Sequence, residues 1–432
     1  MKKIFKFSPI LAVLLLSACN FKYTYEIQGV NNMGGGGADG DLWDDPSGID
    51  DSGTYDIKIW VDEKIESLTR SQIGSFEMAY GGKYTIKANI EPMDEGGAAS
   101  SMLQDVQSGA DIFCFAQDQL SRLKVAGAVS KITGSLKTFL QDTNSADSIK
   151  AGSINDTDLY ALPVTSDNGY FLYYDKSVVS EDAAKNMTTL LAALKAKNRT
   201  LNFEGRSNGW YAASYFLGTG CHSNWTIDPV SGKFTSYDDN YDSDLGVIAG
   251  KGIREIADAS VVSKSATLSD KCGAVVTGIW EYEAAKEQWG DNLVCAEMPS
   301  FTVDGTDYHL SSFDGYKLMG VKPQVDSKKA SVCRKLAQFL TNRASQLERF
   351  RTVSWGPTNV SVSEDPDVLA HPGLTALREQ HKYATQQGQC PGAWFVALQA
   401  TATAIETGTS EEDIRSILHT YSAGLDALKS ED

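Results

Sequence analysis

Apolar and polar residues alternate at Tyr55–Asp62 (YDIKIWVD), as in a β-strand with one buried face. Ile65–Tyr80 then repeats apolar residues at helical spacing and ends at a Gly-Gly pair. The chain continues with two further predicted strands, YTIKANIEP and ADIFCFAQD, and two predicted helices, AASSMLQDVQSG and QLSRLKVAGAV. This alternation of strands and helices predicts an α/β fold with mostly parallel sheets and helices on both faces.

Candidate binding residues stand where the predicted strands end. Asp62 and Glu63 follow the first strand, and Phe115, Gln117 and Asp118 lie at the end of the third. Ligands of parallel sheets bind at the carboxyl ends of the strands. We therefore expect these five residues at one rim of a binding site.

The N-terminus carries a short apolar run that does not fit the α/β pattern. Lys2 and Lys3 form a charged start before Ile10–Leu16, which is too short to span a bilayer, and small residues then lead to Cys19. Leu16-Ser17-Ala18-Cys19 resembles the lipobox of bacterial lipoproteins. We expect residues 1–18 to be a signal peptide and Cys19 to be lipidated, which anchors the protein on the extracytoplasmic face of the cell membrane. The alternative is a secreted protein with an incidental cysteine.

Residues 19–53 are rich in Gly, Asp and Ser and poor in branched apolar residues. This composition predicts a flexible tether between the lipidated cysteine and the folded body. A calcium loop is the alternative, but Asp39, Asp41 and Asp44 do not have EF-hand spacing, and Trp43 takes a ligand position. We expect neither a metal ion nor a cofactor.

The net charge restricts the partners that the protein can bind, and the cysteine spacing restricts its metal and disulfide chemistry. The chain has 432 residues and a formal net charge of −17, so its surface repels nucleic acid and other polyanions. The cysteines beyond Cys19 do not have metal-ligand spacing. Cys114 and Cys333 lie in apolar patterns and are predicted to be buried thiols. Cys221 and Cys272 flank glycine-rich segments and can form a disulfide.

Six segments of the folded part follow one another along the chain: IWVDEK, SGADIFCFAQDQLSRLKVAGAVSKI, YALPVTSDNGYFLYYDKSVV, GAVVTGIWEYEAAK, YKLMGVKPQVDSKKASVCRKLAQFLT and GAWFVALQATATAIETG. In this order they resemble the extracellular solute-binding proteins of bacterial ABC importers, of the maltose-binding type. The resemblance implies two α/β lobes, a multi-strand hinge, a sugar in the cleft between the lobes, and the transmembrane permease subunits as partners. We expect a monomer.

The resemblance also divides the chain between the two lobes. Residues 54–166 and 316–356 are predicted to form the N-lobe, and residues 167–315 and 357–432 the C-lobe. Lobes joined by several strands can close around a ligand as rigid bodies. A ligand that touches both lobes favours the closed state, so the protein captures and releases it without chemistry.

The predicted cleft loops carry the side chains that a sugar requires. A pyranose has apolar C–H faces and a hydroxyl equator, so it binds flat aromatic rings together with carboxylates and amides. The resemblance implies that Phe115 occupies a ring-platform position. Besides the five rim residues, the candidates are Asp167, Asn168, Trp210, Tyr211, Trp280, Tyr282, Trp394 and Phe395.

Two positions depart from the maltose-binding pattern. Gln119 follows Asp118 where the family has arginine, and Asn168 replaces a glutamate in the crossing between the lobes. The aromatic set is retained while the polar set differs. We therefore expect a maltooligosaccharide as the first ligand and a different oligosaccharide as the alternative.

A secreted glycosidase is the competing interpretation, because such enzymes also combine aromatic platforms with carboxylates. Glu281 and Glu283 lie near Trp280, but side chains two residues apart in a turn-to-helix segment point in different directions. The sequence has no H-E-x-x-H or P-loop motif. A lipid-anchored adhesin or starch-tethering module is a third interpretation, although such modules are usually β-sandwiches.

Overall fold

The computed structural model describes residues 41–43, 45–228, 230–408 and 410–429. The predicted signal peptide, the predicted lipidation site Cys19 and residues 20–40 of the predicted tether lie outside these residues. In the part of the chain that the structure describes, no helix combines the length and the apolar character needed to cross a membrane.

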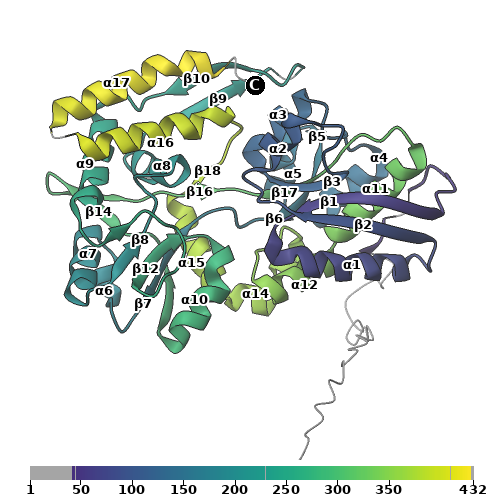
Figure 1. The fold of residues 1–432 in the computed structure, drawn as a ribbon, viewed down its shortest axis with the longest axis horizontal. Coiled ribbons are helices and arrows are strands. Elements are labelled where there is room, and N and C mark those ends of the chain that lie inside the picture. Colours follow the sequence, from purple (N-terminus) through teal and green to yellow (C-terminus); the bar gives the residue numbers. More distant parts are fainter. Residues whose placement is uncertain (1–40, 44, 229, 409, 430–432) are drawn as a thin grey trace, which may run out of the picture. The chain divides into compact units, whose positions relative to one another are not determined.

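One five-stranded sheet, with its helices, forms what we call the N-lobe and has the strand order β2–β1–β3–β17–β6. β1 pairs in parallel with β2 and β3, whereas β17 runs antiparallel to β3 and β6. Helices α1, α2 and α11 contact the strands of this sheet (Figure 1). The bounds are Gly53–Val61 (β1), Tyr84–Pro92 (β2), Ile112–Ala116 (β3), Ala161–Thr165 (β6), Lys317–Val321 (β17), Glu66–Ala79 (α1), Ala98–Gln104 (α2) and Ser327–Leu340 (α11).

Strand β3 is buried along its whole length, because each of its faces packs in a different core. Ile112 and Cys114 join the core that contains residues of α1 and α11. Phe113 and Phe115 face the opposite way and join the core with α2 and α3 (Leu120–Val125). A strand in this position reads as a continuous apolar run rather than an alternating one.

A second five-stranded sheet, with its helices, forms the C-lobe and has the order β11–β8–β12–β7–β13. β8 pairs in parallel with β11 and β12, and β7 runs antiparallel to β12 and β13. Helices α7 and α15 contact this sheet. The bounds are Phe171–Asp175 (β7), Thr200–Asn202 (β8), Val262–Ser263 (β11), Cys272–Thr277 (β12), Leu293–Ala296 (β13), Met187–Ala196 (α7) and Pro372–Gln380 (α15).

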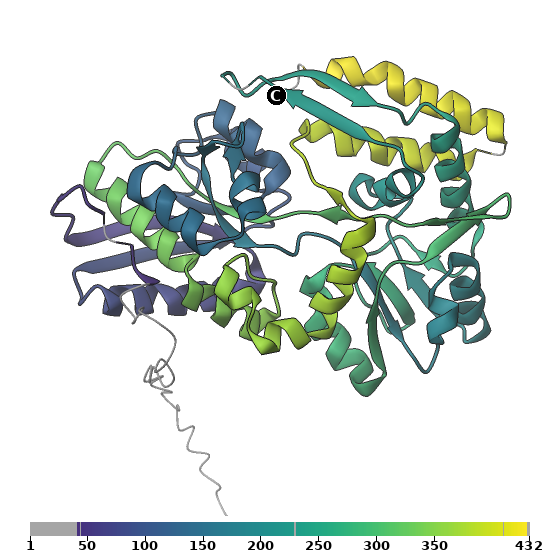
Figure 2. The same ribbon diagram turned by 180° about the vertical axis from the view of Figure 1, so that it is seen from behind.

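A layer of long helices completes the C-lobe. Helix α16 contacts α8, α9 and α17, and in both ribbon views α16 and α17 run side by side next to the hairpin β9–β10 (Figures 1 and 2). The bounds are Gly209–Gly218 (α8), Asp244–Asp258 (α9), Gly392–Thr407 (α16), Glu411–Leu428 (α17), Ser223–Ile227 (β9) and Phe234–Asp239 (β10).

The remaining elements connect these layers. They are Gly134–Thr143 (α4), Ala146–Ala151 (α5), Ser153–Ile154 (β4), Asp158–Leu159 (β5), Glu181–Ala184 (α6), Tyr282–Trp289 (α10), Ser300–Val303 (β14), Thr306–His309 (β15), Phe313–Asp314 (β16), Arg343–Val353 (α12), Val360–Ser363 (α13), Pro366–Ala370 (α14) and Thr385–Gln386 (β18).

The antiparallel strand of each sheet is the one whose chain arrives from the other lobe. β7 follows β6 of the N-lobe, and β17 returns from the C-lobe. The crossing segments are hydrogen-bonded to one another: Ser166 N donates to Gly356 O at 3.0 Å, and Asn168 N donates to Gly315 O at 3.1 Å. The crossings therefore form one connected hinge between the lobes.

Glycine allows the crossing segments to approach so closely. A Cβ atom at Gly315 would lie 2.9 Å from the carbonyl oxygen of Asn168, and one at Gly169 would lie 2.5 Å from that of Phe313. Backbone atoms cannot yield as a flexible side chain can. A larger residue at either position would therefore separate the strands of the hinge.

The structure corrects the predicted extent of the tether, because Trp43 and Asp51 of that segment are buried against the N-lobe. The Trp43 side chain is buried, and its Nε1 donates to Ser135 Oγ at 3.0 Å. The buried carboxylate of Asp51 lies 2.7 Å from Lys335 Nζ and 2.8 Å from Lys83 Nζ. The sequence predicted a flexible tether here, because the partners of Trp43 and Asp51 are distant in the sequence.

The predicted start of the last C-lobe segment at residue 357 stays a prediction, but contacts place two residues just after it against the N-lobe. Thr358 N donates to Gln346 Oε1 at 2.8 Å, and Asn359 forms a bridge with Asn144, so both residues pack on the N-lobe.

The cysteines Cys221 and Cys272 are separate thiols in the described structure, so the predicted disulfide between them is absent there.

Candidate ligand-binding site

Parallel strands of the N-lobe end at one edge of the sheet and bring polar side chains together there. Asp62 follows β1, Glu95 follows β2, and Asp118 follows β3 in a short turn of 3-10 helix, Gln117–Gln119. β17 runs in the opposite direction, so its first residue, Lys317, pairs with Ala116 at the same edge. The local cause is the sheet register, which aligns the carboxyl ends of β1, β2 and β3.

The C-lobe contributes aromatic rings from the start of a helix and from the turn after a strand. Trp210 and Tyr211 lie in the first turn of α8, where the Asn208 side chain caps the helix by accepting from Trp210 N at 3.0 Å. Trp280 follows β12 in the turn Ile279–Glu281. The rings of Trp210 and Trp280 have centroids 6.1 Å apart and planes inclined by 34°.

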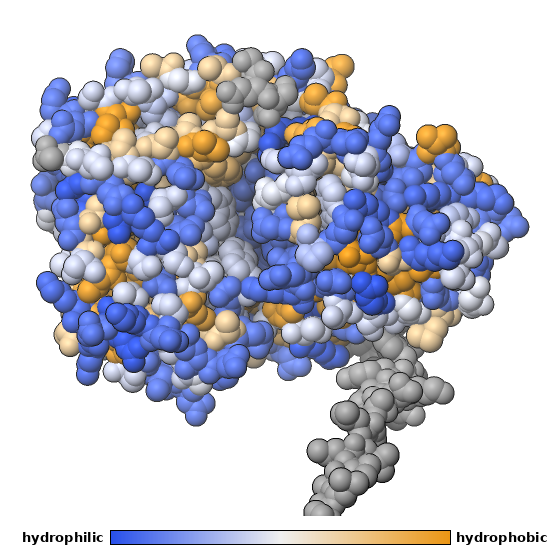
Figure 3. All heavy atoms as spheres, in the orientation of Figure 1, coloured by the Kyte–Doolittle hydropathy of each residue, from blue (hydrophilic) through white to orange (hydrophobic). Residues whose placement is uncertain are grey.

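These groups line a cavity of about 370 Å³ between the two lobes. The molecular surface is hollowed between the lobes in the space-filling view (Figure 3). The volume suits a ligand of small-molecule size. The lining residues are Asp62, Asp94, Glu95, Gly96, Ala116, Asp118, Gln119, Asn168, Asn208, Trp210, Tyr211, Trp280, Lys317, Gln387 and Phe395.

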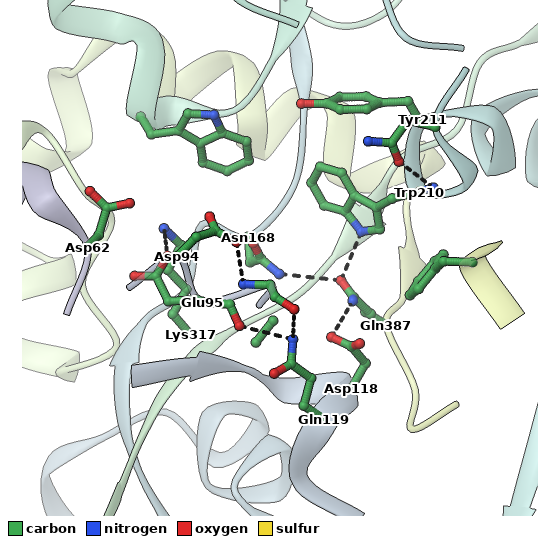
Figure 4. A pocket seen from close by; sticks show the side chains of 15 residues that line it. Asp62, Asp94, Glu95, Asp118, Gln119, Asn168, Trp210, Tyr211, Lys317 and Gln387 are labelled. Atoms are coloured by element: carbon green, nitrogen blue, oxygen red, sulfur yellow. Dashed lines mark hydrogen bonds and ion pairs between the residues drawn. The ribbon is translucent and has the colours of Figure 1, made fainter. Parts of the chain in front are cut away.

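The cavity has two chemically different walls. Its carboxylates come from loops of the N-lobe, whereas its aromatic rings come from α8, α16 and the turn after β12 in the C-lobe. The close-up shows Trp210 and Tyr211 on one side and Asp62, Asp94 and Glu95 on the other (Figure 4). A ligand that fills the space touches both lobes.

Lys317 is the buried cation of the site. Its Nζ lies 3.2 Å from Glu95 Oε2, and it stands 3.9 Å from the ring centroid of Trp355 and 5.3 Å from that of Trp280. Burial alone would lower the pKa of Lys317, but the nearby carboxylates together raise it, so the ammonium stays charged. Burial raises the pKa of Glu95, and the attraction of Lys317 offsets only part of that effect.

Asp62, Asp94 and Glu95 are the described residues that could hold a cation. One carboxylate oxygen from each lies within 4.8 Å of the others. The Lys317 ammonium already lies against Glu95 and supplies positive charge to this cluster. The cluster therefore places carboxylate groups next to a fixed donor.

A network of amides joins the walls at the base of the cavity (Figure 4). Gln387 Nε2 donates to Asp118 Oδ1 at 2.8 Å, and Trp210 Nε1 donates to Gln387 Oε1 at 3.3 Å. Burial raises the pKa of Asp118 to about 6, although attraction to Arg122 and the bond from Gln387 lower it. Asp118 therefore changes its charge within the physiological pH range.

The structure brings together one part of the sequence-predicted site. Among the thirteen predicted residues, those that line the cavity are Asp62, Asp118, Asn168, Trp210, Tyr211, Trp280 and Phe395. Glu63 does not line it, because its side chain is exposed at the start of a short 3-10 turn.

Three predicted aromatic residues are corrections, because they pack in cores. Phe115 points to the core face of β3 opposite α1, as described above. Trp394 is buried in the helix layer, where its Nε1 donates to Tyr421 Oη at 2.8 Å. Tyr282 packs its ring 4.2 Å from that of His371. Helical geometry explains the Trp394 error, since adjacent residues of α16 face different sides and Phe395 takes the cavity side.

Two predicted polar residues support the site without lining it. Asp167 is buried in the hinge and accepts a hydrogen bond from Gly356 N. Gln117 is also buried, and its Oε1 accepts from Tyr316 N at 2.7 Å. Both side chains are therefore occupied by backbone partners from distant segments.

Sequence reasoning missed several lining residues. Asp94 and Glu95 follow β2 as Asp62 follows β1, so the strand-end rule could have found them. Lys317 starts a strand, and Gln387 lies in a polar loop (QQGQ), and neither position carries a recognisable sequence signal. The further residues missed are Gly96, Ala116, Gln119 and Asn208.

Residues 72–376 match the family described as bacterial extracellular solute-binding proteins. The chain belongs to this family. The family membership confirms the resemblance that the ordered sequence segments indicated. One relative of this solute-binding protein is the galactooligosaccharide-binding protein of Bacillus subtilis (strain 168). It is 22% identical over 391 residues, which cover 82% of this chain and 86% of the relative.

Solved structures confirm the predicted two-lobed α/β fold of this solute-binding protein. A structure solved with acarbose is 23% identical and covers 87% of this chain and 100% of its own, with a TM-score of 0.74. The maltodextrin binding protein of L. casei BL23, solved without ligand, is 20% identical and covers 87% of this chain and 99% of its own, with a TM-score of 0.71.

Proposed function

We propose that this protein is the lipid-anchored binding component of an ABC importer, which captures an oligosaccharide in the cavity between its lobes and delivers it to the membrane permease. A maltooligosaccharide is the first ligand that we propose. Delivery leaves the ligand chemically unchanged, because binding and release suffice for transport. Cys19 is the proposed anchor.

The observation that carries this proposal is the pairing of the two cavity walls. Trp210 and Trp280 offer tilted rings to the apolar faces of sugar units. Asp62, Asp118 and Glu95 offer carboxylate oxygens to hydroxyl groups, and charge-assisted hydrogen bonds are about twice as strong as neutral ones. A purely apolar ligand would desolvate these carboxylates further without offering them hydroxyl partners, which costs free energy.

The names of the relatives support an oligosaccharide ligand and leave two classes of oligosaccharide to compare. One is a galactooligosaccharide-binding protein, and several similar structures are of maltodextrin- or maltose-binding proteins. We place the α-glucan first because the resemblance of the sequence segments is to the maltose-binding type. Galactooligosaccharides are the alternative.

A binding panel tests the proposal. Isothermal calorimetry and thermal shift would be run with maltose to maltopentaose, galactooligosaccharides and free monosaccharides. A ligand at 100 times its Kd should stabilise the protein by about 2.7 kcal/mol. We expect the maltooligosaccharides to produce the largest shift, and a panel in which no oligosaccharide shifts the melting curve would contradict the proposal.

Product analysis separates binding from hydrolysis. The glycosidase interpretation relied on Glu281 and Glu283, but Glu281 lies 3.1 Å from Lys64 Nζ and Glu283 accepts from Ser354 Oγ. Neither glutamate belongs to the described residues that line the cavity. Recovery of intact ligand after long incubation supports the importer component, whereas shortened products would support an enzyme. Binding restricted to insoluble granules would support a tethering module.

Fractionation of cells tests the proposed anchor. Parent protein is expected in the membrane fraction, and Cys19→Ala is expected to be released or to keep its signal peptide. Equal membrane association of the two proteins, with the signal peptide removed from both, would contradict lipidation at Cys19.

A further inference from the structure

Gln387 lies on the segment that links α15 to α16 and crosses the base of the cavity. Short strand β18 fixes this segment by pairing with β16, and Gln387 N donates to Asp314 O at 3.0 Å. Its carbonyl accepts from Gln117 Nε2 of the N-lobe. The residue is 3% exposed. Its backbone is therefore held from both sides before any ligand binds.

The side-chain amide of Gln387 contacts three residues that line the cavity. Its Oε1 accepts from Trp210 Nε1 at 3.3 Å and from Asn168 Nδ2 at 3.5 Å, and its Nε2 donates to Asp118 Oδ1 at 2.8 Å. Trp210 belongs to the C-lobe, Asp118 to the N-lobe and Asn168 to the hinge. One amide thus joins a ring of one wall to a carboxylate of the other.

Only an amide satisfies these partners together. The carbonyl oxygen has two lone pairs for the two donors, and the NH₂ group supplies the proton for Asp118. A glutamate would keep the acceptor but place a second negative charge against Asp118. A methionine of similar length would remove both functions and leave buried polar groups without partners, which costs more than the bonds themselves contribute.

We propose that Gln387 is a positioning residue for ligand binding, whose amide sets the orientation of the Trp210 ring and of the Asp118 carboxylate toward the cavity. The consequence for binding rests on the function proposed above. The orientation itself does not, and it can be measured without ligand.

Gln389 provides a matched control two residues further along the same segment. Its Nε2 donates to Gln117 O at 2.5 Å, and its Oε1 accepts from Ser121 N at 2.9 Å. These contacts hold backbone groups of the N-lobe, and Gln389 is not among the described residues that line the cavity. Gln389→Met therefore removes a glutamine of the same segment without touching Trp210 or Asp118.

The first experiment uses ligand-free full-length protein labelled with ¹⁵N-tryptophan and ¹³C-aspartate. The indole N–H signal of Trp210 is identified by its loss in Trp210→Phe. In Gln387→Met this signal should move, and the titration midpoint of Asp118 should rise because the donor that stabilises the carboxylate is gone. Arg122, the charged neighbour that attracts the Asp118 carboxylate, is unchanged in the variant.

Gln387→Glu separates the two roles of the amide. Its carboxylate can still accept from Trp210, so the indole signal should stay near that of the parent, while the Asp118 midpoint should rise further through like-charge repulsion. Gln389→Met should change neither signal. The proposal is overturned if Gln387→Met leaves both signals unchanged, or if Gln389→Met moves them equally.

The second experiment measures affinity for maltotriose by calorimetry between about pH 5 and pH 8. Gln387→Met should weaken binding about ten-fold at neutral pH, as the loss of a hydrogen bond to a charged group implies. The pH at which affinity is half lost should also rise. A loss no larger than in Gln389→Met would overturn the binding role. Failure of the parent to bind any sugar would instead contradict the proposed function, and the NMR signals would still decide the orientation.

Discussion

At the scale of single residues, the aromatic wall should account for much of the binding energy. Trp280→Ala removes a ring that lines the cavity and lies 6.1 Å from the Trp210 ring. We expect it to weaken oligosaccharide binding by about 2 kcal/mol, or roughly thirty-fold, because stacking and apolar burial are both lost. Titration of intrinsic fluorescence or calorimetry would measure the change.

Trp394→Phe is the control for this prediction. Trp394 lies in the core of the helix layer and bonds Tyr421, so the variant should lower the melting temperature and leave affinity unchanged. Parent-like binding by Trp280→Ala, together with weak binding by Trp394→Phe, would mean that the cavity is not the site.

The buried carboxylate of Asp118 is expected to lower the stability of the fold and to strengthen ligand binding. Its pKa is raised to about 6 by burial, so above that pH the ionised carboxylate destabilises the fold, by on the order of 1–3 kcal/mol. Asp118→Asn should therefore raise the melting temperature at about pH 8. The gain should shrink as pH falls from about 6 toward 4, where the parent carboxyl takes up its proton. Binding should weaken, since the amide accepts hydroxyl hydrogen bonds less strongly than the carboxylate.

Two measurements check this prediction about Asp118. Thermal unfolding across pH follows stability, and calorimetry at about pH 7 follows binding. An Asp118→Asn variant that is less stable than the parent at high pH would show that Arg122 and Gln387 compensate the buried charge fully.

At the scale of elements, the segment before β1 is part of the N-lobe. The Asp51 carboxylate bonds Lys335, Lys83, Ser331 and Tyr84. Burial would raise its pKa, but these bonds outweigh burial and hold the pKa well below its usual range. Asp51→Ala should cost about 3 kcal/mol at neutral pH, because it leaves the buried Lys335 without its carboxylate.

The pH dependence of the stability loss in Asp51→Ala shows whether the charge of the carboxylate causes it. A depressed folded pKa contributes stability that is present above about pH 4 and is lost as pH falls further, so the difference between parent and variant should narrow in acid. Asp50→Ala is the matched control, because the Asp50 side chain is exposed and accepts its hydrogen bonds from Ser52 in the same turn. Urea unfolding of the three proteins at several pH values would make the comparison.

The element boundaries show how far local pattern reaches. YTIKANIEP predicted β2 with the bounds that the structure has, because alternation and flanking turns define a strand locally. The helix predicted through Gly109 instead ends at Gln104, since the Asp105 side chain accepts from Gln107 N and Ser108 N and competes with the helix. Tyr170–Tyr174 alternates between two cores and is buried on both faces, which a local pattern does not show.

At the scale of the whole folded body, contacts between the lobes hold the cavity in its present form. Lys64 Nζ, from the N-lobe, donates to Trp280 O at 2.7 Å and pairs with Glu281 at 3.1 Å. In a second contact between the lobes, Lys124 Nζ of the N-lobe donates to Val230 O of the C-lobe at 2.6 Å. Both lysines are partly exposed, so each contact should contribute modestly and weaken with salt.

Lys64→Ala should therefore loosen the lobes without unfolding either one. We expect a larger radius of gyration in small-angle scattering of the ligand-free protein, and an affinity reduced about three-fold. Lys58→Ala removes a comparable pair, Lys58–Glu91 at 2.9 Å, that lies within the N-lobe sheet, and should change neither quantity. Identical scattering of the two variants would contradict a role for Lys64 in lobe contact.

The sequence by itself determined the α/β class, the position of most early strands and helices, and the strand ends that carry Asp62 and Asp118. These features follow from periodicity and from the geometry of parallel sheets, which act over short stretches of chain. It also supplied the aromatic candidates Trp210 and Trp280, each of which follows a glycine within two residues.

Only the tertiary structure decided which of those candidates share one cavity. Neighbours such as Trp394 and Phe395 differ in the side of the helix they occupy, and packing against Tyr421 selects between them. Lys317 and Gln387 enter the site because an antiparallel strand and a crossing segment bring distant residues to the same sheet edge. Such pairings depend on contacts across hundreds of residues, and no local pattern of apolar and polar positions encodes them.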